Sequence, residues 1–190
     1  MAVVTSKTAD LVELAVARAA RAFSALVDRP VEPVHADVAS DLEPDELSSM
    51  AWECGVVFEL LGAVEGGVAL LFSRAQRDAL FAQMLGVDEV DAGDESGASA
   101  LMEVANIVVS HVASEIAEVS GQPLIPSVPT LVERRAPAPL DQMVEGRSCG
   151  FELHRCALSD VEGVLGGALL LLTAGAPAEQ SQGPPGSPVR

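Results

Sequence analysis

The sequence predicts an α+β fold in which two similar halves share one antiparallel sheet with helices packed on it. Two long amphipathic segments, 8–27 and 97–120, have the period of helices, and two apolar stretches, 64–72 and 164–172, follow short polar turns as strands of hairpins do. The chain has 190 residues, of which 49% are hydrophobic and only 3% aromatic. A chain of this length can bury one sizeable core, which must be aliphatic here.

The two halves align at a spacing of 93 residues. "RPVEPV" (29–34) then lies over "QPLIPS" (122–127) with both prolines matched, and "FEL" (58–60) lies over a second "FEL" (151–153). Downstream, "VEGGVALLF" resembles "VLGGALLLL" at a spacing of 100, so seven extra residues are expected in the second half. We interpret this pattern as an internal duplication, which predicts two halves related by a pseudo-twofold axis.

Each half is expected to contain the same elements in the same order. A helix comes first, and a short proline-containing strand follows it. A hairpin strand is then expected near Val56–Leu61 or Cys149–His154, with an apolar strand after each Gly-Gly pair, because glycine permits the tight turn. The first half continues into a further helix over 73–85, for which Ser73 is the expected N-cap. The second half lacks this helix.

These elements define the predicted organisation of the chain as one compact domain. The first repeat covers 6–86, and an acidic linker, "VDEVDAGDESG" (87–97), joins it to the second repeat at 98–172. The remaining residues, 173–190, are rich in Pro, Gly, Ser and Gln and predict a disordered tail.

Charge and composition exclude several classes of function. The formal net charge of −17 argues against binding a phosphate backbone, which requires clustered basic residues. The three cysteines have no zinc-site spacing, and the three histidines are scattered, so we expect no metal site. No uninterrupted apolar run reaches the roughly 20 residues that span a bilayer, and the N-terminus does not resemble a signal peptide. A cytoplasmic chain without membrane insertion is therefore expected.

The helix predicted over 97–120 has two different faces. Its core face is expected to contain an apolar stripe, namely Leu101, Val104, Ala105, Val108, Val109, Val112, Ile116 and Val119. Its opposite face contains Ser99, Glu103, Asn106, Ser110 and Ser114. A solvated face usually has long charged side chains at i,i+4 spacing, whereas one Glu and one Asn stand among small serines here. The stripe is either a plain polar face or a surface that another molecule approaches closely. Glu115 has no role in either pattern.

The spacing Ser99-x3-Glu103-x2-Asn106-x22-Pro129 resembles the signature of the CheC/CheX/FliY family of chemotaxis phosphatases. That signature is Asp or Ser, three residues, Glu, two residues, Asn, twenty-two residues and Pro. The resemblance extends over the duplicated body, roughly residues 6–172, and is closest to CheC. It implies an internally duplicated CheC-like fold and hydrolysis of the aspartyl phosphate of a CheY-type response regulator.

The resemblance also implies a role for each motif residue. Asn106 is expected to position the attacking water, and Glu103 is expected to contact a lysine of the regulator. Ser99 is expected to line the helix start, and Pro129 to shape the strand behind the helix, although a simple turn proline explains Pro129 equally well. We expect the protein to need no cofactor of its own, and Mg²⁺ is expected in the partner regulator, since this chain shows no metal cluster.

The first half contains a degenerate copy of the same motif. At the 93-residue spacing it is Ser6-x3-Asp10-x2-Glu13-x22-Ala36, which lacks the amide and the proline. A carboxylate at the Asn position repels a phosphoryl group. The chain therefore resembles a family member with one intact site. Asp10 and Glu13 are equally explained as acids near a helix N-terminus, where they stabilise the helix dipole.

A second class of function remains open from the sequence. Relatives of this fold act without catalysis, as adaptors that bind a response regulator, the flagellar switch or the receptor deamidase CheD. The loss of the first site and of the last helix fits such a role. Asn106 separates the two interpretations, because an adaptor has little need of an exposed amide there.

Overall fold

The structure is a computed structural model that describes residues 2–39, 52–62, 64–86, 95–135, 139, 142 and 151–174. The described strands form one seven-stranded antiparallel sheet in the order β1-β6-β7-β3-β2-β4, and β5 also pairs with β2. The first half supplies β1 (Val31–Ala39), β2 (Cys54–Gly62) and β3 (Gly66–Phe72). The second half supplies β4 (Leu124–Pro126), β5 (Thr130–Glu133), β6 (Phe151–Asp160) and β7 (Gly166–Ala174).

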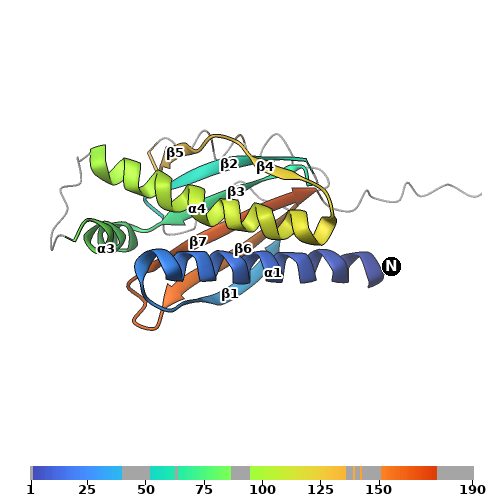
Figure 1. The fold of residues 1–190 in the computed structure, drawn as a ribbon, viewed down its shortest axis with the longest axis horizontal. Coiled ribbons are helices and arrows are strands. Elements are labelled where there is room, and N and C mark those ends of the chain that lie inside the picture. Colours follow the sequence, from blue (N-terminus) through green and yellow to red (C-terminus); the bar gives the residue numbers. More distant parts are fainter. Residues whose placement is uncertain are drawn as a thin grey trace, which may run out of the picture.

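Two long helices cover one face of this sheet. Figure 1 shows α1 (Ala2–Val27) and α4 (Glu95–Ser120) side by side and running in opposite directions across the strands. A shorter helix, α3 (Arg74–Leu85), follows β3 and lies at one end of the sheet. The α+β class, the antiparallel sheet and the placement of both long helices on one face are therefore confirmed.

The main core lies between the two long helices and the sheet. The apolar stripe of α4 is almost fully buried from Leu101 to Ile116, and Ala15, Ala19 and Phe23 of α1 are buried beside it. Phe23 also stacks on Phe72 of β3, with ring centroids 6.4 Å apart. Val119 is 43% exposed, so its assignment to the core face is wrong: it lies in the last turn of α4, beyond the buried stripe.

Among the described residues, one helix is long and apolar enough by length and composition to cross a membrane: α4, at Gly97–Ser120, with a mean hydropathy of 1.3. Core helices of soluble proteins meet the same criteria. Here the apolar stripe of α4 is buried against the sheet, and a row of polar side chains occupies the other side. Packing inside the protein therefore accounts for the hydropathy of α4.

The strand registers are compatible with an internal duplication. If Val31 corresponds to Leu124 at the 93-residue spacing, then their partners Asp160 and Gly62 correspond to each other as well. The same correspondence continues through the pairs β2–β3 and β6–β7 toward the middle of the sheet, where Ala69 of β3 becomes equivalent to Leu170 of β7. These two residues are paired with each other. A pseudo-twofold axis perpendicular to the sheet requires such a self-paired position, and it lies at the junction of the two halves.

The two "FEL" stretches do not occupy equivalent positions in the sheet. The same registers place Phe58 opposite Val68 and make its counterpart Cys156, not Phe151. The spacing between equivalent residues of the two halves is 93 at β1 and β4, 98 at β2 and β6, and 101 at β3 and β7. The second half therefore has extra residues both before its β6–β7 hairpin and within it. The expected single insertion of seven residues is therefore wrong, because one shared tripeptide does not determine a strand register.

The first half ends in a helix, α3, that has no counterpart among the described residues of the second half. Ser73 caps α3 through a reciprocal capping box: its hydroxyl accepts from the Gln76 backbone N–H, and the Gln76 side chain accepts from the Ser73 N–H. This confirms the predicted N-cap. Phe81 of α3 packs against Gly97 of α4 so closely that a Cβ at Gly97 would lie 2.6 Å from the ring. The chain therefore enters α4 through a position where a side chain does not fit.

Element boundaries differ slightly from the predicted domain limits. Helix α4 begins at Glu95, inside the predicted linker, and β7 continues to Ala174, inside the predicted tail. Most of both predicted segments, 87–94 and 175–190, lies outside the described residues.

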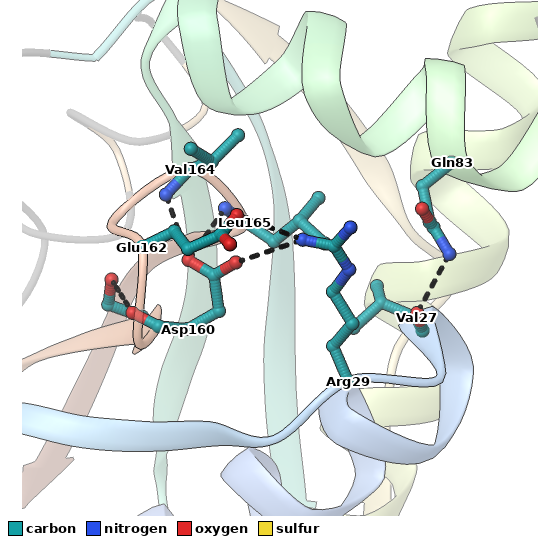
Figure 2. Close-up of polar contacts among 8 residues, drawn as sticks. Val27, Arg29, Gln83, Asp160, Glu162, Val164 and Leu165 are labelled. Atoms are coloured by element: carbon teal, nitrogen blue, oxygen red, sulfur yellow. Dashed lines mark hydrogen bonds and ion pairs between the residues drawn. The ribbon is translucent and has the colours of Figure 1, made fainter.

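A carboxylate closes the turn between β6 and β7. Asp160 is only 8% exposed, and its Oδ1 accepts hydrogen bonds from the backbone N–H groups of Val164 and Leu165 at 2.8 and 3.1 Å. Arg29, which precedes β1, lies 3.8 Å from Asp160 and 3.2 Å from Glu162 (Figure 2). Nearby, the Gln83 amide of α3 donates to the Val27 carbonyl at the end of α1. This end of the fold is thus held by polar contacts between both halves.

Asp160→Ala should lower the free energy of unfolding by about 1–3 kcal/mol, because it leaves two turn N–H groups without an acceptor. Asp160→Asn keeps an acceptor and should lose less. Urea denaturation measures both. Glu162→Ala is the matched control, since that side chain is 70% exposed and should change stability little. An Asp160→Ala protein as stable as the wild type would contradict the assigned role.

Candidate functional site

The polar stripe of α4 is on the molecular surface. Ser99, Glu103, Asn106, Ser110 and Ser114 are all exposed, whereas the apolar stripe from Leu101 to Ile116 on the other side of the helix is buried. Ser114 donates a hydrogen bond from its hydroxyl to the Ser110 carbonyl at 2.8 Å, so it is occupied by its own helix. The stripe therefore presents two long polar groups, one carboxylate and one amide, among hydroxyls.

Glu103 and Asn106 are held in place by the backbone beneath them. The neighbouring residues Val104 and Ala105 are 0% exposed, and so are Val108 and Val109 one turn further on. Within the described part of the chain, neither Glu103 nor Asn106 forms a hydrogen bond or ion pair through its side chain. The helix is fixed by packing while both groups remain available to a second molecule, as expected of a surface that acts on a partner.

Glu115, which the periodicity left unexplained, pairs with the other long helix. Its Oε2 lies 3.2 Å from Nε of Arg18 on α1, and its side chain is only 14% exposed. The contact is an ion pair whose angle does not make it a hydrogen bond. Because the partners are 97 residues apart in the sequence, no local pattern could have revealed this link between the two helices.

Pro129 lies in a short break between β4 and β5, which both pair with β2. The break is held by Ser127: its N–H donates to the Glu59 carbonyl at 2.8 Å, and its hydroxyl accepts from the Glu59 N–H at 3.0 Å. Proline has no N–H to contribute to a ladder, so it suits this unpaired position. The structure thus brings Pro129 to the strand region next to α4.

The first half has the same feature without the proline. The register of β1 against β6 shifts between Pro33 and His35, at the place equivalent to the break between β4 and β5. Ala36, which stands where the second half has Pro129, is paired with Cys156 in a continuous strand. The degenerate copy therefore retains the irregularity but not the interruption.

The acids of the degenerate motif are also on the surface. Asp10 and Glu13 on α1 are exposed, and Leu14 beside them is 44% exposed. Ser6 lies in α1, but its side chain is outside the described set. Both motif faces therefore point away from the sheet, and only that of α4 carries the amide.

The described residues contain no group of three or more His, Cys, Asp or Glu that could hold a metal ion. Cys54 and Cys156 are free and buried, and burial raises the pKa of both thiols, that of Cys54 to about 11. These thiols are thus protonated at neutral pH and behave as small apolar side chains. Cys149 lies outside the described residues.

His154 occupies a core position that corresponds to Val56 in the first half. It is 5% exposed, with Nε2 3.5 Å from Thr173 Oγ1 and 3.7 Å from Glu152. Burial lowers the pKa of its imidazole, and the Glu152 carboxylate opposes this effect. The folded protein therefore holds His154 in its neutral form to lower pH than the unfolded chain does.

This difference predicts a pH-dependent stability. In the unfolded chain the His154 imidazole takes up a proton near pH 6.5, and in the folded chain it does so only at lower pH. The contribution of neutral His154 to the free energy of unfolding is therefore complete above about pH 6.5 and is lost as the pH falls below that value. Urea midpoints measured from about pH 7.5 to 5 should fall less steeply for His154→Val than for the wild type. His111→Gln, which changes an exposed residue of α4, is the control. Parallel wild-type and His154→Val curves would rule out the effect.

Comparison with known proteins agrees with this geometry. Residues 97–133, which run from the start of α4 to the end of β5 and contain the complete motif, match the model of the CheC-like family. No curated protein sequence matches the chain. Among solved structures, FliY of Thermotoga maritima superposes with a TM-score of 0.67 at 16% identity, covering 92% of each chain. The chain has a CheC-like fold.

Two further structures share this CheC-like fold. A chain of the CheX–CheY–BeF3–Mg²⁺ complex from Borrelia burgdorferi matches with a TM-score of 0.55 at 16% identity, covering 86% of this chain and 96% of that one. A chain of the FliG–FliM complex from H. pylori matches with a TM-score of 0.61 at 12% identity, covering 90% and 92%. Identities this low establish the fold alone. The resemblance to the CheC, CheX and FliY proteins is thus confirmed at the level of fold and of the 97–133 segment.

Proposed function

We propose that this protein hydrolyses the aspartyl phosphate of a CheY-type response regulator, using the outward face of α4. The observation that carries the proposal is the pair Glu103 and Asn106, exposed on a helix whose opposite side is buried from Leu101 to Ile116. The pair also lies within the segment that matches the CheC-like family. The complex of CheX with CheY, a chain of which shares this fold, supports a response regulator as the partner.

An acyl phosphate is hydrolysed by in-line attack of water, so the catalyst mainly has to position that water and tolerate the charge on the phosphoryl group. The Asn106 amide has an acceptor oxygen for a water proton and N–H donors for a phosphoryl oxygen. Because the amide is uncharged, the phosphoryl group does not repel it. The small neighbours Ser99 and Ser110 leave room for the partner surface to approach the helix.

Glu103 serves docking in this proposal. It lies one turn before Asn106 on the same face, and its exposed carboxylate can pair with a lysine of the regulator. Such a pair would draw the lysine away from the phosphoryl group. The Mg²⁺ ion belongs to the regulator, and this chain contributes no ligand to it.

The second candidate function is a non-catalytic adaptor. The likeness to FliY and to a chain of the FliG–FliM complex favours it, because the second of these structures is a complex of two proteins. An adaptor would bind a response regulator or the flagellar switch through the same face, or bind the deamidase CheD. The two functions differ in whether loss of the Asn106 amide changes phosphate lifetime or only binding.

Asn106→Ala should slow regulator dephosphorylation by about two orders of magnitude and leave the fold intact, because the water loses its positioning group while no core contact is lost. The measurement is the decay of a phosphorylated response regulator from the same cell. Ser110→Ala, on the same exposed face one turn away, is the matched control and should retain activity. Glu103→Ala should weaken both regulator binding and turnover.

If the Asn106→Ala protein shortens the phosphate lifetime of the regulator as much as the wild-type protein does, the catalytic proposal is wrong. If the wild-type protein binds the regulator without shortening that lifetime at all, the adaptor function is the correct one.

The degenerate motif gives an independent prediction. Changing Asp10 and Glu13 together to Ala should leave phosphatase activity within about twofold of the wild type, because a carboxylate at the Asn position cannot approach a phosphoryl group favourably. The double variant and Asn106→Ala are assayed under identical conditions. If the double variant loses turnover while Asn106→Ala keeps it, the active site lies in the first half of the protein and the assignment to α4 is wrong.

A further inference from the structure

Four arginines gather around one pocket at the α3 end of the sheet. Arg74 and Arg77 come from the first two turns of α3, and Arg134 and Arg135 follow the end of β5. The pocket has a volume of about 260 Å³, and Glu53, Cys54 and Glu133 complete its lining. No residue of α4 lines it, so it is separate from the proposed catalytic face.

This gathering runs against the composition of the chain. The protein has 28 acidic residues and only 11 Lys and Arg in 190 positions, yet four of those 11 line one small pocket. They come from elements about 60 residues apart in the sequence, so the fold brings them together. Guanidinium groups repel one another, and such a gathering is stabilised when an anion sits between them.

Two of the arginines are held in place by the protein itself. Arg77 is 15% exposed and donates from Nε and one terminal nitrogen to Asp78 Oδ1 at 2.9 and 2.6 Å. A guanidinium has five N–H donors, so the remaining edge of Arg77 can still bind an acceptor. Across the pocket, Arg134 donates from Nη1 to the Trp52 carbonyl at 3.2 Å, and its backbone N–H donates to the Glu53 carbonyl.

Charge favours an anion in this pocket despite its carboxylates. Glu53 and Glu133 line it, and Asp78 lies 3.8 Å from Arg74 as well as against Arg77. Among the described residues named here, four guanidinium groups outnumber these three carboxylates by one, in a strongly acidic protein. The Cys54 thiol, protonated at neutral pH, adds no negative charge. Arg74 is the first residue of α3, so the positive end of the helix dipole borders the same space.

We propose that this pocket binds the phosphate group of a small ligand. Arginines from two separate elements line the pocket, and a phosphate has enough acceptor oxygens to meet several guanidinium groups at once, whereas one carboxylate meets a single one. The volume lies below the roughly 300–1,000 Å³ of drug-sized sites, which fits inorganic phosphate or the head of a small phosphate monoester. Both sources share this chemistry, and the experiment separates them.

The test is an NMR titration of the full chain at constant pH and ionic strength. Inorganic phosphate should produce saturable shifts in the amide signals of Glu53, Arg77 and Arg134, and chloride at the same ionic strength should not. Glycerol 3-phosphate forms the second arm: at least tenfold tighter binding than inorganic phosphate assigns the site to monoesters, and equal or weaker binding assigns it to free phosphate.

The variant Arg74→Gln/Arg135→Gln should weaken phosphate binding at least tenfold. Both side chains are exposed, so the fold should be retained, and circular dichroism checks this. The variant Arg74→Lys/Arg135→Lys keeps the positive charges but loses the paired N–H donors of the guanidinium groups. Its affinity for phosphate should lie between those of the wild type and the Gln variant. Arg21→Gln on the exposed side of α1 is the control and should bind like the wild type. Shifts that are equal in phosphate and chloride, or full binding by the Gln variant, would overturn the proposal.

Discussion

The structure depends on one constraint: two long amphipathic helices must bury their apolar stripes on the same face of a shared sheet. The pairing of β3 with β7 satisfies it, because this antiparallel pair joins the halves about a pseudo-twofold axis between Ala69 and Leu170. The axis is perpendicular to the sheet, so it keeps both helices on one side and makes them antiparallel neighbours. Once both stripes are buried, the polar sides of α1 and α4 must face outward. The position of the candidate site is thus a consequence of core packing.

The same symmetry shows where the halves have diverged. The Val56 position of the first half is His154 in the second, and Phe72 corresponds to Thr173. The first half continues from Phe72 into α3, which packs on β3 and β7. The second half has no such helix among the described residues, and polar groups stand at the equivalent positions. Its hairpin instead closes around Asp160, whose carboxylate ties the turn to Arg29 of the other half.

Sequence reasoning succeeded where the signal is local and periodic. The stripe from Leu101 to Ile116 and the cap at Ser73 depend on residues within one or two turns, so they could be predicted. The match between the "FEL" stretches failed because register is decided by hydrogen bonds between distant strands, which a tripeptide does not encode. For the same reason, the pair Arg18–Glu115 and the arginine pocket could not be foreseen. Their partners meet only after the sheet and helices have assembled. Of the candidate site, the sequence predicted the exposed face; the contacts it makes with a partner stay a prediction.

The break at Pro129 connects the symmetry with the difference between the two faces. Both halves shift register at the same place on the strand that follows the long helix, so the irregularity is common to the two halves and not particular to one site. Only the second half widens that shift into an unpaired stretch, and only that half carries Glu103 and Asn106. In the first half, Ala36 stays in the ladder, and acids stand at the corresponding helix positions. The amide and the interruption therefore occur together, which is the pattern expected if one surface has kept a task that the other has lost.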